Sequence, residues 1–127
     1  MAFLLVGAGA FFGACARYGI TKISELALGA SFPLGTLLSN VLAGILIGFI
    51  IRASATRWHL ADNHRLFLTT GLLGGLSTMS TLNIETVQMF TAGKTLLGIA
   101  NIVLNLALSI GGVFLGMWIA DMVYARQ

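Results

Sequence analysis

Glycines and hydroxyl side chains interrupt an otherwise apolar part of this chain between residues 71 and 81. The adjacent Gly74 and Gly75 are followed closely by four hydroxyl residues, Ser77, Thr78, Ser80 and Thr81. Non-helical backbone at membrane depth is tolerated only where protein buries it or where it lines a water-filled cavity. In transporters, broken helices of this kind direct carbonyl and amide groups at ions near the bilayer midplane. The segment therefore predicts ion handling by a helix that is broken at Gly74-Gly75.

Amide side chains occur in equally apolar surroundings. Asn40 lies in the middle of one apolar segment, and Asn101, Asn105 and Ser109 recur every four residues in another. This spacing places the last three residues on one face of a helix. An amide in hydrocarbon is costly unless it is hydrogen-bonded. Two interpretations stay open here: hydrogen bonds between helices, or polar groups that line a pore and replace the water around a permeating anion.

Two charged residues, Arg17 and Glu85, also fall within apolar segments. Charges inside a membrane are by default candidates for a functional role. Arg17 either attracts anions into a vestibule or pairs with Glu85 and fixes the packing of the helices. We favour the structural role.

The composition identifies the class of protein to which these residues belong. Of the 127 residues, 57% are hydrophobic and 9% are charged, and the mean hydropathy is +0.96. Soluble domains carry about 25% charged residues, and about 20 apolar residues span a bilayer. Residues 33–51 and 95–120 are free of charge. The chain is therefore predicted to be a membrane protein, and its scattered basic residues give no nucleic-acid-binding cluster.

These patterns predict an all-α membrane protein with one domain, residues 1–127, and four transmembrane helices at about 3–28, 33–52, 64–91 and 95–122. Because no basic region precedes the first apolar stretch, we expect a retained helix rather than a signal peptide. Two pairs of glycines four residues apart predict faces at which helices approach closely. They are Gly44 with Gly48 and Gly112 with Gly116.

The distribution of basic residues gives only a weak orientation. An even number of helices places both termini and the 52–65 loop on one side of the membrane. Arginines predominate on that side, namely Arg52, Arg57, Arg65 and Arg126, and Lys22 and Lys94 lie on the other. The positive-inside rule then favours cytoplasmic termini only slightly, which permits insertion in both directions.

A single bundle of four helices leaves no aqueous pore, because the helices pack around their own side chains. A channel built from this chain should therefore be an oligomer, most simply a two-fold dimer. In an antiparallel dimer, the two broken helices would face each other near the middle of the membrane. Their converging carbonyl groups would suit a small hard cation such as Na⁺.

Four sequence signatures occur together along the chain. They are Gly13-Ala-Cys-Ala-Arg17-Tyr18, Pro33-Leu-Gly-Thr36 followed by Asn40, Gly74-Gly75-Leu-Ser-Thr-Met-Ser-Thr with Glu85, and Asn105 to Ser109. In this combination the sequence resembles the small bacterial fluoride channels, the Fluc or CrcB family. The resemblance covers essentially the whole chain.

This resemblance implies a passive, fluoride-selective channel, not an enzyme, in the bacterial plasma (inner) membrane. It implies a dual-topology dimer in which two pathways carry fluoride out of the cytoplasm around a central structural Na⁺. The backbone carbonyls of Gly74 and Ser77 would hold this Na⁺, twice each by symmetry. Asn40 would line the fluoride pathway, and the other implied pathway residues are Met79, Ser80, Thr81, Leu82, Asn83, Asn105 and Ser109.

The chain departs from the family pattern after the break. The family places two phenylalanines there, whose electropositive ring edges face fluoride. This chain has Met79 and Leu82 at those two positions, and Asn83 replaces a family serine. The amide of Asn83 donates two hydrogen bonds, which can compensate for the loss of the rings.

Two alternatives follow from these departures and from the small size of the chain. The chain could be one subunit of a heterodimeric fluoride channel whose partner supplies the phenylalanines. It could also be a small proton-coupled, dual-topology exporter, which needs a carboxylate near the middle of the first helix. The first helix has no acidic residue before Glu25, which argues against an exporter.

Overall fold

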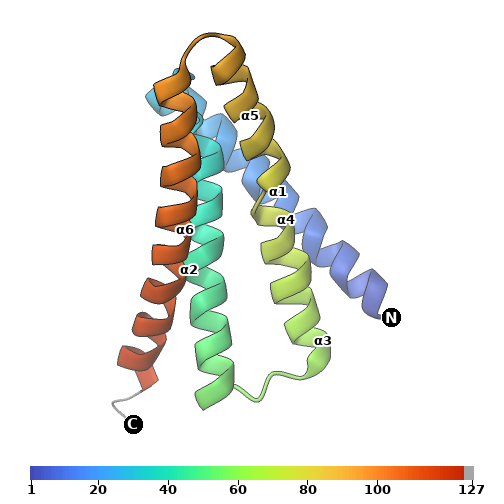
Figure 1. The fold of residues 1–127 in the computed structure, drawn as a ribbon. Coiled ribbons are helices and arrows are strands. Elements are labelled where there is room, and N and C mark those ends of the chain that lie inside the picture. Colours follow the sequence, from blue (N-terminus) through green and yellow to red (C-terminus); the bar gives the residue numbers. More distant parts are fainter. Residues whose placement is uncertain (125–127) are drawn as a thin grey trace.

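The computed structural model describes residues 1–124 of the chain, and within them it contains helices and no strand (Figure 1). Arg126, which the orientation argument used, lies outside the described residues. The elements are α1 (Ala2–Leu28), α2 (Leu34–Thr56), α3 (Asp62–Arg65), the π-helix η1 (Leu66–Leu73), α4 (Gly74–Leu76), α5 (Met79–Thr91) and α6 (Thr95–Tyr124). The prediction of an all-helical fold is confirmed.

Three of the described helices are long and apolar enough to cross a membrane, namely α1, α2 and α6. They correspond to the first, second and fourth predicted segments, and Pro33 immediately precedes α2, where its fixed φ suits a helix start. The third predicted segment, 64–91, is divided among α3, η1, α4 and α5. No single helix of this segment is long enough to span a bilayer alone.

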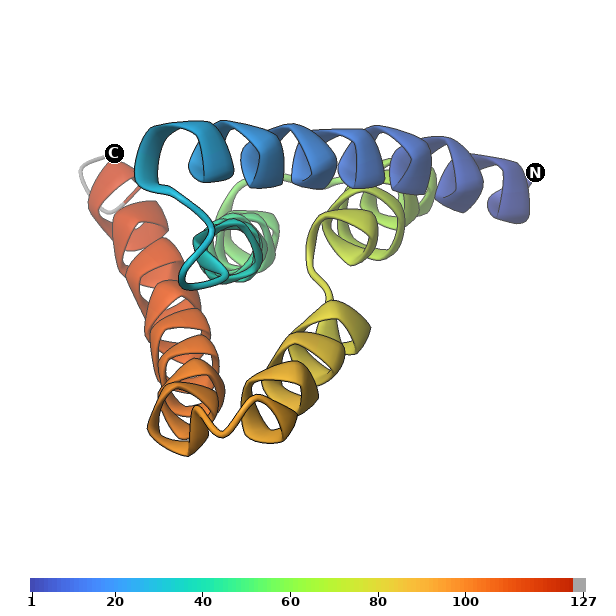
Figure 2. The ribbon, with the colours of Figure 1, turned by 90° about the horizontal axis from the view of Figure 1, so that it is seen from above.

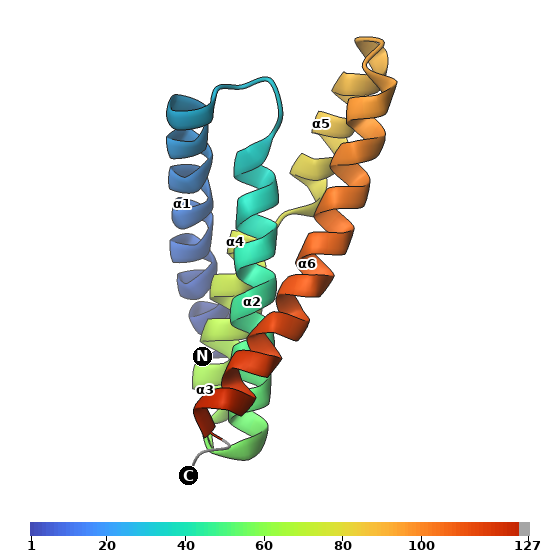
Figure 3. The same ribbon diagram turned by 90° about the vertical axis from the view of Figure 1, so that its left-hand side faces the viewer.

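The helices α2 and α6 run side by side, and glycines on both form their contact (Figures 1 and 3). A Cβ atom on Gly44 would lie 2.5 Å from the Ser109 carbonyl oxygen, and one on Gly112 would lie 3.0 Å from that of Val41. Cβ atoms on Gly48 and Gly116 would meet backbone oxygens of the facing helix as closely. The two predicted close-packing faces are therefore confirmed, and they face each other.

A second glycine contact joins α1 to η1 and α4, which α1 crosses along one side of the molecule (Figure 2). A Cβ atom on Gly75 would lie 2.5 Å from the Ala10 carbonyl oxygen, and one on Gly71 would lie 2.8 Å from that of Val6. Gly13 faces the backbone of Leu72 in the same way. Backbone therefore touches backbone here, and even one methyl group would separate the helices.

Burial is inverted relative to a soluble protein. The largest side chains that are fully buried are polar: Asn101, Asn105 and Ser39. Large apolar side chains are exposed instead, including Phe3 at 94% and Phe114 at 68%. A soluble monomer rarely exposes such extensive apolar surface, whereas lipid and a partner subunit both cover it favourably.

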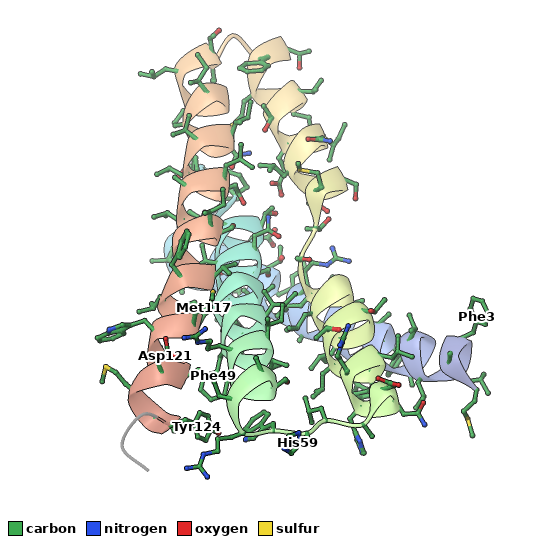
Figure 4. All side chains as sticks on the ribbon, turned by 60° about the horizontal axis from the view of Figure 1, so that its bottom comes forward. Phe3, Phe49, His59, Met117, Asp121 and Tyr124 are labelled. Carbon is green, nitrogen blue, oxygen red and sulfur yellow. The ribbon has the colours of Figure 1, made fainter. Side chains whose placement is uncertain are left out.

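An aromatic cluster marks the end of the molecule near the α2–α3 loop. The rings of Phe49, Trp58 and Tyr124 lie within 6.3 Å of one another, centre to centre. Beside them Arg52 donates to Asp121 at 2.6 Å, and Figure 4 shows Phe49, Asp121 and Tyr124 at this end. Aromatic rings and charges of this kind are typical of the membrane–water interface.

Candidate ion site

The third segment loses its helical conformation at Ser77 and Thr78. Both have extended backbone angles, with ψ of 153° at Ser77 and 117° at Thr78, and helix α5 begins at Met79 (Figure 1). The Thr78 hydroxyl accepts a hydrogen bond from the Thr81 N–H at 3.2 Å. Thr78 is thus an N-cap, a position that favours hydroxyl side chains. One hydroxyl of this run, that of Thr78, therefore has a structural role: it caps the start of α5.

The predicted position of the break, at Gly74-Gly75, is wrong. Both glycines belong to α4, and Gly74 has helical angles, with φ of −63° and ψ of −35°. Gly75 is required instead by the close contact with Ala10 of α1. The sequence signal was a packing feature that lies directly before the break rather than the break itself.

The side chain of Asn40 bridges α2 to the broken segment. Its Oδ1 accepts the Thr78 N–H at 2.7 Å, and its Nδ2 donates to the Thr78 carbonyl at 3.3 Å and to Asn105 Oδ1 at 2.9 Å. The amide therefore pairs with both backbone groups of Thr78, as a neighbouring strand would. Asn40 supplies the hydrogen bonds that the chain gives up when it leaves the helix.

This arrangement separates the carbonyls of Gly74 and Ser77 from their usual donors. In an unbroken helix the Gly74 carbonyl would accept the Thr78 N–H, which is bonded to Asn40 instead. The Ser77 carbonyl would accept the Thr81 N–H, which is bonded to the Thr78 hydroxyl. Both residues are exposed and line one cavity. Uncompensated carbonyl oxygens suit a hard cation such as Na⁺, so the two residues fit the predicted ion.

Acidic residues, histidines and cysteines give no alternative metal site within residues 1–124. The oxygens that the break itself presents are those of backbone carbonyls and hydroxyl side chains. Such ligands carry no full charge and are typical of alkali-metal sites in membrane proteins.

Arg17 and Glu85 do not pair with each other. Arg17 Nε donates to the Gly75 carbonyl at 3.1 Å. Glu85 Oε1 accepts from the Thr36 hydroxyl at 2.7 Å, and within the described residues Glu85 Oε2 is buried without a hydrogen-bond partner. The proposed ion pair is therefore wrong. The structural role of Arg17 rests on its bond to Gly75, which would accept the Met79 N–H in a continuous helix.

A cavity of about 400 Å³ opens beside the break, between α2, η1, α4, α5 and α6. Its lining includes these residues predicted for the site: Asn40, Gly74, Ser77, Met79, Leu82, Asn105 and Ser109. Ser80 and Asn83 are exposed and do not line it, and Thr81 accepts a bond from the Thr78 hydroxyl at 3.0 Å. Within this cavity Leu82 is 4% exposed and Met79 is 62% exposed.

A second cavity, of about 410 Å³, lies between the end of α1, the start of α2 and α5. Its lining includes Glu25, Thr36, Glu85 and Lys94. The Glu85 side chain therefore lies beside this second cavity and not beside the first one. Sequence reasoning did not identify Thr36 as its partner, because the two residues are 49 positions apart.

The amides of α6 form a buried chain rather than an open stripe. Asn105 Nδ2 donates to Asn101 Oδ1 at 3.0 Å, and Asn101 Nδ2 donates to the Thr86 hydroxyl at 3.1 Å. Asn101 is 0% and Asn105 2% exposed. Of the predicted stripe, Asn105 and Ser109 line the first cavity and Asn101 does not. Sequence reasoning missed Thr86, because a hydroxyl does not stand out in a helix that also carries Ser80, Asn83 and Glu85.

Known proteins resemble this chain over nearly its whole length. Residues 4–117 match the family described as CrcB-like protein, Camphor Resistance (CrcB). A Fluoride-specific ion channel FluC from Clostridium perfringens (strain 13 / Type A) is 45% identical over 95% of this chain and 94% of its own length. The FluC proteins of Clostridium novyi (strain NT) and Roseiflexus sp. (strain RS-1) are 40% and 39% identical, over 94% and 97% of their lengths.

These relatives are ion channels, so the predictions of a multi-pass protein of the bacterial inner membrane and of a chain that is not an enzyme are confirmed. The resemblance drawn from the four sequence signatures is confirmed as well. On the extent of the family match and on 45% identity across 121 residues, the chain belongs to the CrcB family.

Proposed function

We propose that this protein is a passive channel that exports fluoride from the cytoplasm. The relatives named fluoride-specific ion channels support the substrate. One structural observation carries the ion-handling role. The break at Ser77–Thr78 releases two carbonyls beside a cavity that amide and hydroxyl groups also line. Such a site offers neutral donors and acceptors at close quarters, which is what selective ion passage needs.

A second subunit completes the site in this proposal. Gly74 and Ser77 are exposed in the single chain, and the cavity beside them is open. An antiparallel copy placed on this face would bring four carbonyls together, two from each subunit, around a structural Na⁺. Na⁺ bound there would supply positive charge that reduces the repulsion between the converging carbonyl dipoles. The small bias of basic residues supports insertion of the two subunits in opposite orientations.

Fluoride would move along hydroxyl and amide donors next to the break. Asn40 donates to the Thr78 carbonyl at 3.3 Å, which is the weakest of its three bonds and the easiest to exchange for an anion. Ser109 Oγ is buried and has no partner within the described residues, so its hydrogen is available. The remaining proposed donors are Ser80, Thr81, Asn83 and Asn105. A dimer would contain two such pathways, one lined mainly by each subunit's donors.

Neutral donors suit passive conduction of a strongly hydrated anion. They replace its water without the full positive charge that would trap it. Arg17 is occupied by the Gly75 carbonyl, so its charge acts at the break rather than within the row of donors. Outward flow would follow the electrochemical gradient.

The residues at the family's phenylalanine positions decide between a homodimer and a heterodimer. Met79 is polarisable and adaptable, and it is exposed at the mouth of the cavity. Leu82 is buried in the same cavity. We propose the homodimer, because every other pathway residue is present in this one chain. A heterodimeric channel is the second candidate, and Met79 and Leu82 are the observation that favours it.

Fluoride efflux from liposomes containing this chain alone tests the proposal. We expect efflux that responds to membrane potential, excludes chloride and needs no pH gradient. Efflux only in the presence of a pH gradient would instead indicate the exporter. Efflux only after co-expression with a second family member would overturn the homodimer. A dimer whose thermal stability is unchanged when Na⁺ is replaced by a large organic cation would overturn the sodium site.

A further inference from the structure

Five hydrogen bonds connect the break to the middle of α5 through two other helices. The Thr78 N–H donates to Asn40 at 2.7 Å, Asn40 to Asn105 at 2.9 Å, and Asn105 to Asn101 at 3.0 Å. Asn101 then donates to the Thr86 hydroxyl at 3.1 Å, and Thr86 donates to the Leu82 carbonyl at 2.7 Å. The chain leaves α5 at its start, crosses α2 and α6, and returns to α5.

All five bonds point in the same direction. Each side chain accepts from the previous group and donates to the next. The Thr86 hydroxyl has one hydrogen, which it gives to the Leu82 carbonyl, so toward Asn101 it can only accept. Asn101 must therefore present its NH₂ group to Thr86 and its oxygen to Asn105. Asn105 and Asn40 also have backbone anchors that agree with this direction: Asn105 Nδ2 donates to the Asn101 carbonyl at 2.9 Å, and Asn40 Oδ1 accepts the Thr78 N–H.

Burial prevents water from relaxing this requirement. Asn101 is 0%, Asn105 2% and Thr86 5% exposed. A donor that loses its partner in such a place cannot turn to solvent, and it costs its full desolvation. Aligned hydrogen bonds also polarise one another, so the loss of one bond weakens its neighbours. The orientation of Asn101 thus depends on a terminal acceptor, Thr86, that is not part of the cavity lining, and Asn101 Oδ1 in turn accepts from Asn105.

We propose that Thr86 is a positioning residue for the ion pathway. Its hydroxyl orients the Asn101 amide, whose oxygen accepts from Asn105, and it thereby supports the Asn105–Asn40 bond beside the Thr78 peptide. This inference rests on the proposed channel function for its consequence, fluoride passage. Its structural part, the restraint on Thr78, does not depend on which ion passes.

The test compares Thr86→Val, which keeps the shape and removes the hydroxyl, with Thr86→Ser, which keeps the hydroxyl. The readout is hydrogen exchange at the Thr78 amide in the purified full-length protein, followed by NMR. We expect about tenfold faster exchange at Thr78 in the valine variant, because an unsatisfied Asn101 donor disorders the amide chain. The serine variant should restore slow exchange.

Ser24→Ala is the matched control. Ser24 is 6% exposed, and its hydroxyl donates only to the Ile20 carbonyl of its own helix, at 2.7 Å. This substitution removes a buried hydroxyl with a similar backbone bond but leaves the amide chain intact. It should not change exchange at Thr78. If the valine variant does not assemble, Thr86→Cys replaces it, because a thiol is only a weak donor and acceptor.

The outcomes separate this inference from the proposed function. Exchange at Thr78 that is equal in the valine, cysteine and serine variants overturns the positioning role. Faster exchange spread evenly over α5 and α6 also overturns it, because it would show only a loss of packing. Fast exchange confined to the break, with fluoride efflux reduced about tenfold, supports both proposals. The same exchange result without efflux from the unmodified protein supports the positioning role and refutes the channel.

Discussion

The two halves of the third membrane segment are held in place by different means. The first half, η1 and α4, lies against α1 through backbone contacts at Gly71 and Gly75 (Figure 2). The second half, α5, leans away from α1 and is tied to α6 by Thr86 and Asn101 (Figure 3). Backbone packing dominates in the first half, where Arg17 adds one side-chain bond to Gly75, and side-chain contacts dominate in the second half, where Phe90 also packs over Gly98.

This difference explains where the break lies. Close backbone packing needs an intact helix, because only regular backbone gives a continuous surface for the facing helix. Hydrogen-bonding side chains can instead replace the bonds that an open peptide loses. The chain therefore leaves the helix after Leu76, where the glycine contact ends and the amide of Asn40 becomes available.

The largest effect is expected from Gly75→Ala. Its new Cβ would lie 2.5 Å from the Ala10 carbonyl oxygen, so α1 must separate from α4, at a cost of about 3 kcal/mol or more. Thermal unfolding in detergent measures this cost. Gly74→Ala is the control, because its Cβ would meet nothing closer than Thr69 O at 3.9 Å. Equal destabilisation by both substitutions would refute the distinction between the two glycines.

Asn40→Asp should reduce fluoride efflux by about a hundredfold or more. A unit charge about 4 Å from the anion costs about 4 kcal/mol at an effective dielectric constant near 20. The new oxygen would also face the Thr78 and Asn105 oxygens to which Nδ2 now donates. Ser39→Ala, at a buried neighbour with no partner in the described residues, should leave efflux unchanged. Normal efflux in an assembled Asn40→Asp dimer would remove Asn40 from the pathway.

Arg17→Gln should lower the free energy of unfolding by about 2 kcal/mol, because it removes a charged donor from the Gly75 carbonyl. Arg17→Lys keeps the charge but not the geometry of the guanidinium group. If Arg17 acts by position, the lysine variant should be destabilised and should lose efflux as well. Full efflux with lysine, measured beside thermal unfolding, would show that the charge alone matters.

The last prediction concerns the two positions that depart from the family pattern, and its smallest expected effect is that of Met79→Phe. Leu82→Phe should destabilise the protein by at most about 1–3 kcal/mol, because the larger ring must fit at a position that is 4% exposed, although the neighbouring cavity can take part of it. Met79→Phe should change stability by less than about 0.5 kcal/mol, since Met79 is exposed. The efflux rates of both variants should not exceed that of the unmodified protein. A large increase with Met79→Phe and Leu82→Phe together would favour the heterodimer.

Much of the fold could be predicted from local sequence pattern. Charge-free stretches predicted two of the membrane segments, and the helix start after Pro33 followed from its fixed φ. The glycine pairs that begin at Gly44 and Gly112 predicted two close-packing faces, although not that these faces meet each other. Each of these features depends on residues close together in sequence, so periodicity and composition suffice to find them.

The sequence by itself determined the chemistry that is present: glycines and hydroxyls near a break, amides in apolar helices, and two intramembrane charges. Only the tertiary structure decided how these groups pair. It placed Asn40 on Thr78, 38 residues away, and Arg17 on Gly75, 58 residues away, and it moved the break past the glycines. The physical reason is that a hydrogen bond between helices depends on their relative position and rotation, which no local pattern encodes.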